Sequence, residues 1–227
     1  SDFLYGNEGD RYVALAAPRR ALDSRAVAAR LGPAEVSVDL VGDVSLGIAP
    51  DATSVVLNVT AVDPSRQMNL TVWPTGLPKP LASNLNVTQG SVVANQVTVK
   101  LGAGGSLGSG AVSLSTNAGD TDVVIDVVGY SVKSRPGDGA VFEPVAPVRV
   151  LSSRDGIGRY DTPWGPGQTR EVPITGVPAD ATSVVLNVTA TESTAPRSHL
   201  RVFPSGVALP LASSLNFEAG VNTPNLV

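Results

Sequence analysis

The feature that most constrains the fold is a stretch of nine residues that occurs twice without change. The sequence TSVVLNVTA begins at Thr53 and begins again at Thr182. Shorter matches flank both occurrences, at an offset of 129 to 130 residues throughout. That spacing is too long for the unit of a solenoid and has the size of a whole domain. We therefore predict that this chain of 227 residues holds two tandem copies of one module.

The matches divide the chain into four segments. Residues 1–10 align with the linker that precedes the second copy, so we interpret them as the tail of a preceding module. The first copy spans residues 11–132, a polar linker rich in Pro and Gly spans 133–139, and the second copy spans 140–227. The last residue, Val227, aligns with Val97, so the final strands of the first copy have no counterpart. Either the sequence is a segment of a longer array, or another chain supplies the missing strands.

The hydrophobic pattern has a period of two, in short runs separated by Gly, Pro, Asn and Asp. It predicts an all-β fold of two tandem β-sandwich modules, jelly-roll-like, with the second incomplete. Only residues 23–31 look helical, and they hold barely two turns. The run 123–128 is apolar on both faces, which indicates a central strand covered on both sides. Asp126 inside it needs a partner, for which Arg25, Asn86 or a backbone turn are candidates.

Composition excludes several classes of function. A net charge of −4 and a pI near 4.9 leave no basic stripe for nucleic acid. Cysteine is absent, which removes disulfides, thiol catalysis and Cys-based metal sites. The apolar runs have the length of strands, so we expect no membrane span. We also expect no cofactor.

Five motifs together resemble a known repeat. They are PxRxLDSR from Pro18, LNVTA from Leu57, LTVWPxG from Leu70, ASNLN from Ala82 and DVVGY from Asp126. The set is similar to a module that recurs in tandem in secreted and cell-surface proteins of actinobacteria, with the pattern PxRLLDTR, LNVTAT, SNLN and DVxGY. The second copy departs from the pattern at Ser152 and from the first copy at Ser214. The resemblance implies an extracellular or cell-wall-associated accessory or surface role and no established activity.

Catalysis and metal binding have little support in the residues. His199 is the only histidine, and the aligned region of the first copy has Asn69 instead, so we predict no catalytic residue and no enzyme. Asp120 and Asp122 are weak candidates for calcium ligands, because hard cations prefer oxygen. Capping of a turn is the stronger interpretation of both.

Asparagine inside apolar strands is the most unusual polar feature. We predict structural roles for Asn58 and Asn187, as for Arg25 and Asp126. The alternative is a sugar-binding face, with Asn84 and Asn86 as hydrogen-bonding residues and Trp164 as a stacking aromatic. Trp164 lies in a Pro/Gly loop without a match in the first copy, which favours it as the exposed aromatic over Trp73.

Three functions follow, in order of preference. The first is a non-enzymatic structural or adhesive repeat domain, secreted or at the cell surface. The second is a carbohydrate-binding module of a larger extracellular enzyme. The third is a filament or surface-layer subunit that assembles by strand complementation. The partners expected are cell-wall or extracellular polysaccharide, or other copies of the module.

Overall fold

The fold was obtained as a computed structural model, which describes residues 10–81, 83–103, 110–133, 140 and 148–227. The predicted tail and linker therefore lie largely outside the described residues. The described residues form two compact units, one within Ser1–Val141 and Val185–Val227 and the other within Phe142–Val184. Among them, no helix has the length and the apolar character that a membrane crossing needs.

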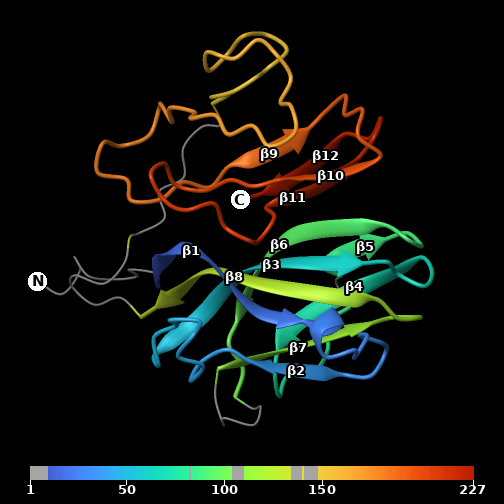
Figure 1. The fold of residues 1–227 in the computed structure, drawn as a ribbon. Helices are drawn as coiled ribbons and strands as arrows, with labels where there is room; N and C mark the ends of the chain where they lie inside the picture. Colours follow the sequence, from blue (N-terminus) through green and yellow to red (C-terminus); the bar gives the residue numbers. More distant parts are fainter. Residues whose placement is uncertain (1–9, 82, 104–109, 134–139, 141–147) are drawn as a thin grey trace, which may run out of the picture. The chain divides into compact units, whose positions relative to one another are not determined.

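Eight strands of the first copy form two antiparallel sheets, which face each other in Figure 1. The first sheet has the order β1–β8–β3–β6 and holds β1 (Arg11–Asp23), β8 (Asp122–Val132), β3 (Ala52–Val62) and β6 (Val92–Lys100). The second sheet has the order β2–β7–β4–β5 and holds β2 (Val36–Asp39), β7 (Ala111–Thr116), β4 (Met68–Pro74) and β5 (Leu85–Val87). This order is that of a jelly roll built from two Greek keys. The prediction of an all-β sandwich is confirmed.

The period-two pattern decides which side chains enter the core. In β3, Leu57 and Val59 point between the sheets and are fully buried, while Asn58 points to the outer side of the first sheet. In β8, Ile125 and Val127 lie in the same core, so Asp126 between them also faces outward. The outer side of the first sheet thus carries the polar residues of otherwise apolar strands.

The helix predicted for residues 23–31 is wrong. Only Ser24–Ala26 form a single 3-10 turn, capped by the Asp23 side chain, which accepts from the backbone N–H of Arg25 at 3.2 Å. Ala28 then adopts a φ of 51°, in the left-handed region that stops a right-handed helix.

Residues 185–227, called the C-terminal segment below, pair as the aligned residues of the first copy do. Their strands are β9 (Asn187–Ala190), β10 (Arg197–Leu200), β11 (Leu215–Glu218) and β12 (Thr223–Leu226). Ala190 lies opposite Thr223, as Ala61 lies opposite Val93. In the first copy, β3 and β4 each have a second neighbour, β8 and β7. Among the described residues, β9 and β10 have one neighbour each, β12 and β11.

The described residues of the second unit, 148–184, contain no strand. This differs from the truncated sandwich predicted for residues 140–227. The reason lies in the pairing of the first copy, where β1 pairs only with β8 and β2 only with β7. Residues 140–227 align with the first copy only as far as Val97 and so contain no counterpart of β7 or β8. Residues that align with β1 and β2 therefore have no strand to pair with.

Candidate functional site

A row of four polar residues crosses the outer side of the first sheet, one from each strand. Arg20 of β1 lies opposite Asp126 of β8, which lies opposite Asn58 of β3, which lies opposite Gln96 of β6. Asp126 and Asn58 are 2% and 6% exposed. Buried polar groups need hydrogen-bond partners, so the partners of this row show which segments contact the outer side of the sheet.

Arg20 is the partner of Asp126. Its Nε donates to Oδ1 of Asp126 at 2.5 Å, and its second terminal nitrogen lies 3.4 Å from Oδ2. Burial raises the pKa of Asp126, and the hydrogen bond and charge of Arg20 oppose that rise. The pairing predicted between Arg25 and Asp126 is wrong. Arg25 instead makes two side-chain hydrogen bonds to Asp23, at 2.8 and 2.7 Å.

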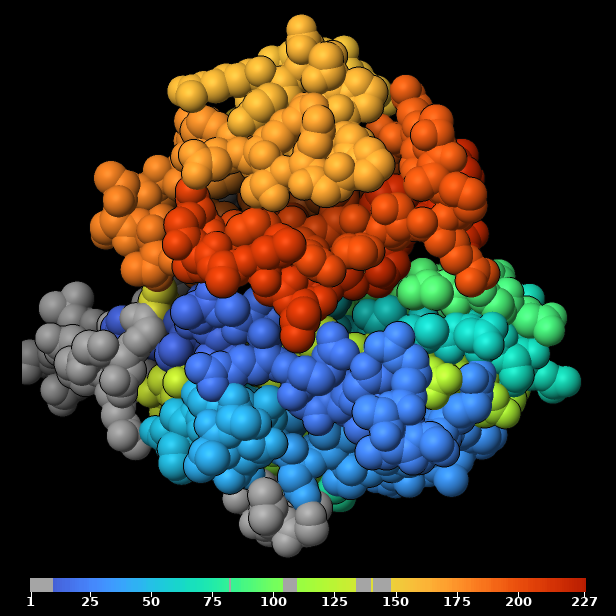
Figure 2. Space-filling view, viewed as in Figure 1, coloured from blue at the N-terminus to red at the C-terminus, as the bar shows by residue number. Residues whose placement is uncertain are grey.

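The other half of the row contacts the C-terminal segment. The amide of Asn58 donates to the backbone carbonyl of Ser213 at 2.6 Å. The backbone N–H of Gln96 donates to Oδ1 of Asn225 at 3.2 Å, and Asn225 is itself buried. Nearby, Arg197 donates to the carbonyl of Gly90 at 2.6 Å. Figure 1 shows β11 and β12 beside β6, and orange and red atoms of this segment meet green atoms of the first copy in Figure 2.

Asparagines at aligned positions make the same internal contacts. Asn95 donates to the backbone carbonyl of Asn84 at 2.8 Å, and Asn225 donates to that of Ser214 at 2.6 Å. Oδ1 of Asn84 accepts from the N–H of Val72 at 2.7 Å, and the hydroxyl of Ser214 accepts the aligned bond. The change from Asn84 to Ser214 therefore keeps the contact. Asn84, a candidate sugar-binding residue, therefore uses its side-chain oxygen to bind backbone within its own module.

Asn187 differs from Asn58, although both stand at the same place in identical sequences. Its side chain is exposed and makes no hydrogen bond to the described residues. The structural role predicted for Asn187 has no contact here to support it.

Asp120 and Asp122, the candidate calcium ligands, both form ion pairs with Arg30. Arg30 donates to Asp120 at 2.6 Å and to Asp122 at 2.8 Å, and Ser24 donates to Asp122 at 2.7 Å. A guanidinium between two carboxylates repels a metal ion. Among the described residues, no group of three or more acidic or His side chains could hold a metal.

Trp164 lies in a self-contained cluster of the second unit. The guanidinium carbon of Arg170 stands 4.2 Å from its ring centroid, and Tyr160 contacts it edge to face at 5.5 Å. Arg170 is held by the carbonyls of Thr162 and Pro163 at 2.9 and 2.7 Å. Trp164 is half-buried and Arg170 covers one face of its ring, so its role as a stacking aromatic for a sugar stays a prediction.

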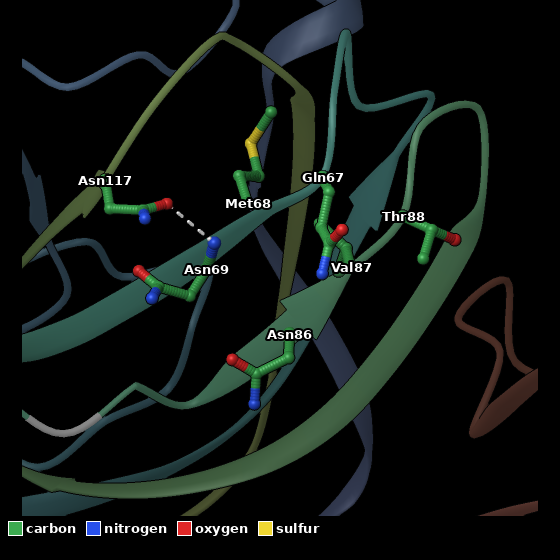
Figure 3. Close-up of a pocket in the computed structure, with 7 residues that line it drawn as sticks. All are labelled: Gln67, Met68, Asn69, Asn86, Val87, Thr88 and Asn117. Atoms are coloured by element: carbon green, nitrogen blue, oxygen red, sulfur yellow. Dashed lines mark hydrogen bonds between the residues drawn. The ribbon is translucent and has the colours of Figure 1, made fainter.

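Asn86 lines an open hollow of about 410 Å³ at the edge of the second sheet (Figure 3). Amides surround it from Gln67, Asn69, Asn86 and Asn117, and its other lining residues are Met68, Val87 and Thr88. Asn69 and Asn86 are cross-strand partners, and the backbone N–H of Asn69 donates to Oδ1 of Asn117 at 2.8 Å. None of the lining residues is aromatic. Donors and acceptors lie together here, which suits hydroxyl groups.

Comparisons with family models, curated proteins and solved structures return no match for this chain. The residues that sequence reasoning missed are Gln96 and Ser213, because both act through backbone groups that carry no side-chain pattern. Arg20 was missed as well, because the register shift between Arg20 and Leu22 hides its outward direction from simple alternation.

Proposed function

We propose that this chain is a non-enzymatic structural and adhesive repeat domain, secreted or cell-surface, whose copies pack against one another. One observation carries the proposal. The outer side of the first sheet holds a polar row with two buried members, Asp126 and Asn58, and residues of the C-terminal segment bond to Asn58 and to Gln96 of that row. A repeat that uses one of its repeated strands as a contact surface for the next copy is suited to building a rigid array.

The resemblance to actinobacterial surface repeats supports an extracellular or cell-wall-associated location. Exposed Lys100 and Lys133 allow a direct test with a membrane-impermeant amine-reactive biotin on intact cells. We expect labelling before lysis. Labelling that occurs only after lysis would contradict a location at the cell surface.

Rigid packing of the C-terminal segment is tested by ¹⁵N relaxation. The amides of β9–β12 should share the rotational correlation time of β1–β8. Independent, faster tumbling of β9–β12 in the wild-type chain would contradict the proposed array, because a flexible string cannot set a pitch.

A carbohydrate-binding module is the second candidate, and the amide-lined hollow favours it. Amides of Asn69, Asn86 and Asn117 in one depression could bind sugar hydroxyls. Titration calorimetry with fragments of cell-wall polysaccharide should give heat for the wild type and none for Asn86→Ala. Asn187→Ala is the matched control, because that exposed asparagine lies on another surface.

Strand complementation of the second copy has one supporting observation. Leu57 is fully buried, whereas the aligned Leu186 is only half-buried, and Val202 is exposed where Val72 is buried. The core side around β9 and β10 is therefore less covered than that of β3 and β4 in the described part of the chain, which suits added strands.

A further inference from the structure

Identical strand faces are covered in one copy and open in the other. The outer face of β3 presents Asn58 and Thr60, both buried. The aligned face of β9 presents Asn187 and Thr189, both exposed. Two apolar residues flank that open face, Val185 at 56% and Leu226 at 47% exposure. We call these four residues, Val185, Asn187, Thr189 and Leu226, the receiving face.

What covers the outer face of β3 is the edge of the C-terminal segment at Ser213 and Asn225. The first copy has the same edge, at Ser83 and Asn95, which we call the docking edge. Its internal geometry is already formed, because Asn95 makes the bond to Asn84 that Asn225 makes to Ser214. A preformed edge binds without an ordering cost.

We infer that the receiving face binds the docking edge of a second copy of this chain. The inference rests on the proposed function, and names the partner of the module surface. In the contact, the Asn187 amide donates to the Ser83 carbonyl, as Asn58 donates to Ser213. The backbone N–H of Leu226 takes the place of that of Gln96 and donates to Asn95. Val185 and Leu226 lose their contact with water, which adds a hydrophobic contribution.

The two surfaces differ, so the contact is head-to-tail and leaves one of each surface free after every step. Such a heterologous contact gives rings or open filaments. Chains should therefore add in steps, with no preferred dimer.

Light scattering on the intact chain tests the inference, over concentrations up to about 1 mM, where weak contacts form. The weight-average mass should rise above 23.1 kDa and keep rising with concentration. Val185→Arg should stay monomeric, because a charge then stands in the receiving face. Val44→Arg is the matched control, since Val44 is 93% exposed and lies far from this face in the sequence, and it should assemble as the wild type does.

Mixing gives a second readout. The Val185→Arg chain keeps its docking edge, so an excess of it should cap wild-type chains and lower their mass towards that of a heterodimer. A wild type that stays monomeric throughout would overturn the inference and leave the proposed packing within one chain intact. Assembly that persists in Val185→Arg would also overturn it, and would instead favour a contact on the half-buried core side of β9 and β10.

Discussion

At the scale of single residues, the polar row shows how a buried carboxylate is kept in an apolar strand. Asp126 is almost fully buried, and Arg20 supplies its hydrogen bonds from the neighbouring strand. Arg20 itself is partly exposed and also contacts Asp23 at 3.0 Å. The pair therefore stands at a boundary between protein and water, where the loss of one partner costs less than in a deep core.

Replacement of Arg20 by Ala should lower the free energy of unfolding by about 3 kcal/mol at neutral pH, the low end for a broken buried pair. Urea unfolding measures this change. Arg25→Ala is the control, because Arg25 is half-exposed and bonds only Asp23 among the described side chains. It should cost less than about 1 kcal/mol. Equal losses for both variants would return Arg25 to the role of partner.

The same variant should respond to pH in a defined direction. Burial raises the pKa of Asp126, so ionisation of Asp126 opposes folding as the pH rises through that pKa. Without Arg20 this penalty grows, and the deficit of Arg20→Ala should shrink when acid protonates Asp126. The free energy of unfolding of wild type and Arg20→Ala, measured at a series of pH values, tests this trend. A deficit independent of pH would mean that Arg20 acts by packing alone.

Asp23 should behave in the opposite way. The side-chain hydrogen bond from Arg25 lowers its pKa from 3.8 to about 2. Its contribution to stability is therefore present above its ordinary pKa and is lost as the pH falls towards 2. Asp23→Asn should remove part of the acid sensitivity of the wild type between these values. An unchanged acid transition would show that the Arg25 contact is not formed in solution.

At the scale of strands, one sequence occupies two environments. Leu57 of β3 has sheet neighbours on both sides and a filled core above it, whereas Leu186 precedes a strand with one neighbour. Leu57→Ala should cost about 3 to 5 kcal/mol, the range for a fully buried leucine. Leu186→Ala should cost about 1 kcal/mol, because less apolar surface leaves water there. Thermal unfolding of the two variants compares them directly, and equal costs would mean that the second copy is completed.

Strand periodicity was sufficient to predict the sandwich, because inward and outward residues alternate along β3 and along β8 as far as Val127. It could not place the partner of Asp126. Arg20 lies in β1 and Arg25 in the turn that follows it, and only the register of β1 against β8 shows that Arg20 stands opposite Asp126. The short helix failed for a local reason, the positive φ of Ala28. The contacts of Gln96 and Ser213 were beyond prediction, since they use backbone groups.

At the scale of the whole molecule, the complete sandwich of the first copy and residues 185–227 belong to one compact unit. The first copy completes its own core with β7 and β8, which leaves the outer side of its first sheet for contact with residues 185–227. Residues 185–227 reproduce the pairing of two strand pairs and contact that face through Asn225 and Ser213. Stability in such arrays is a sum of unit and interface contributions, so the interface is open to direct measurement.

The most direct measurement is amide hydrogen exchange of β9–β12 in wild type, Asn58→Ala and Asn187→Ala. Asn58→Ala leaves the partly buried Ser213 carbonyl without its donor, at a cost of about 1 to 3 kcal/mol. Exchange at β11 and β12 should therefore accelerate about fivefold or more, with β1–β8 unchanged. Asn187→Ala, the same change at the aligned exposed position, should alter neither in dilute solution. Equal protection in all three chains would contradict the claim that the outer face of the first sheet holds the next copy.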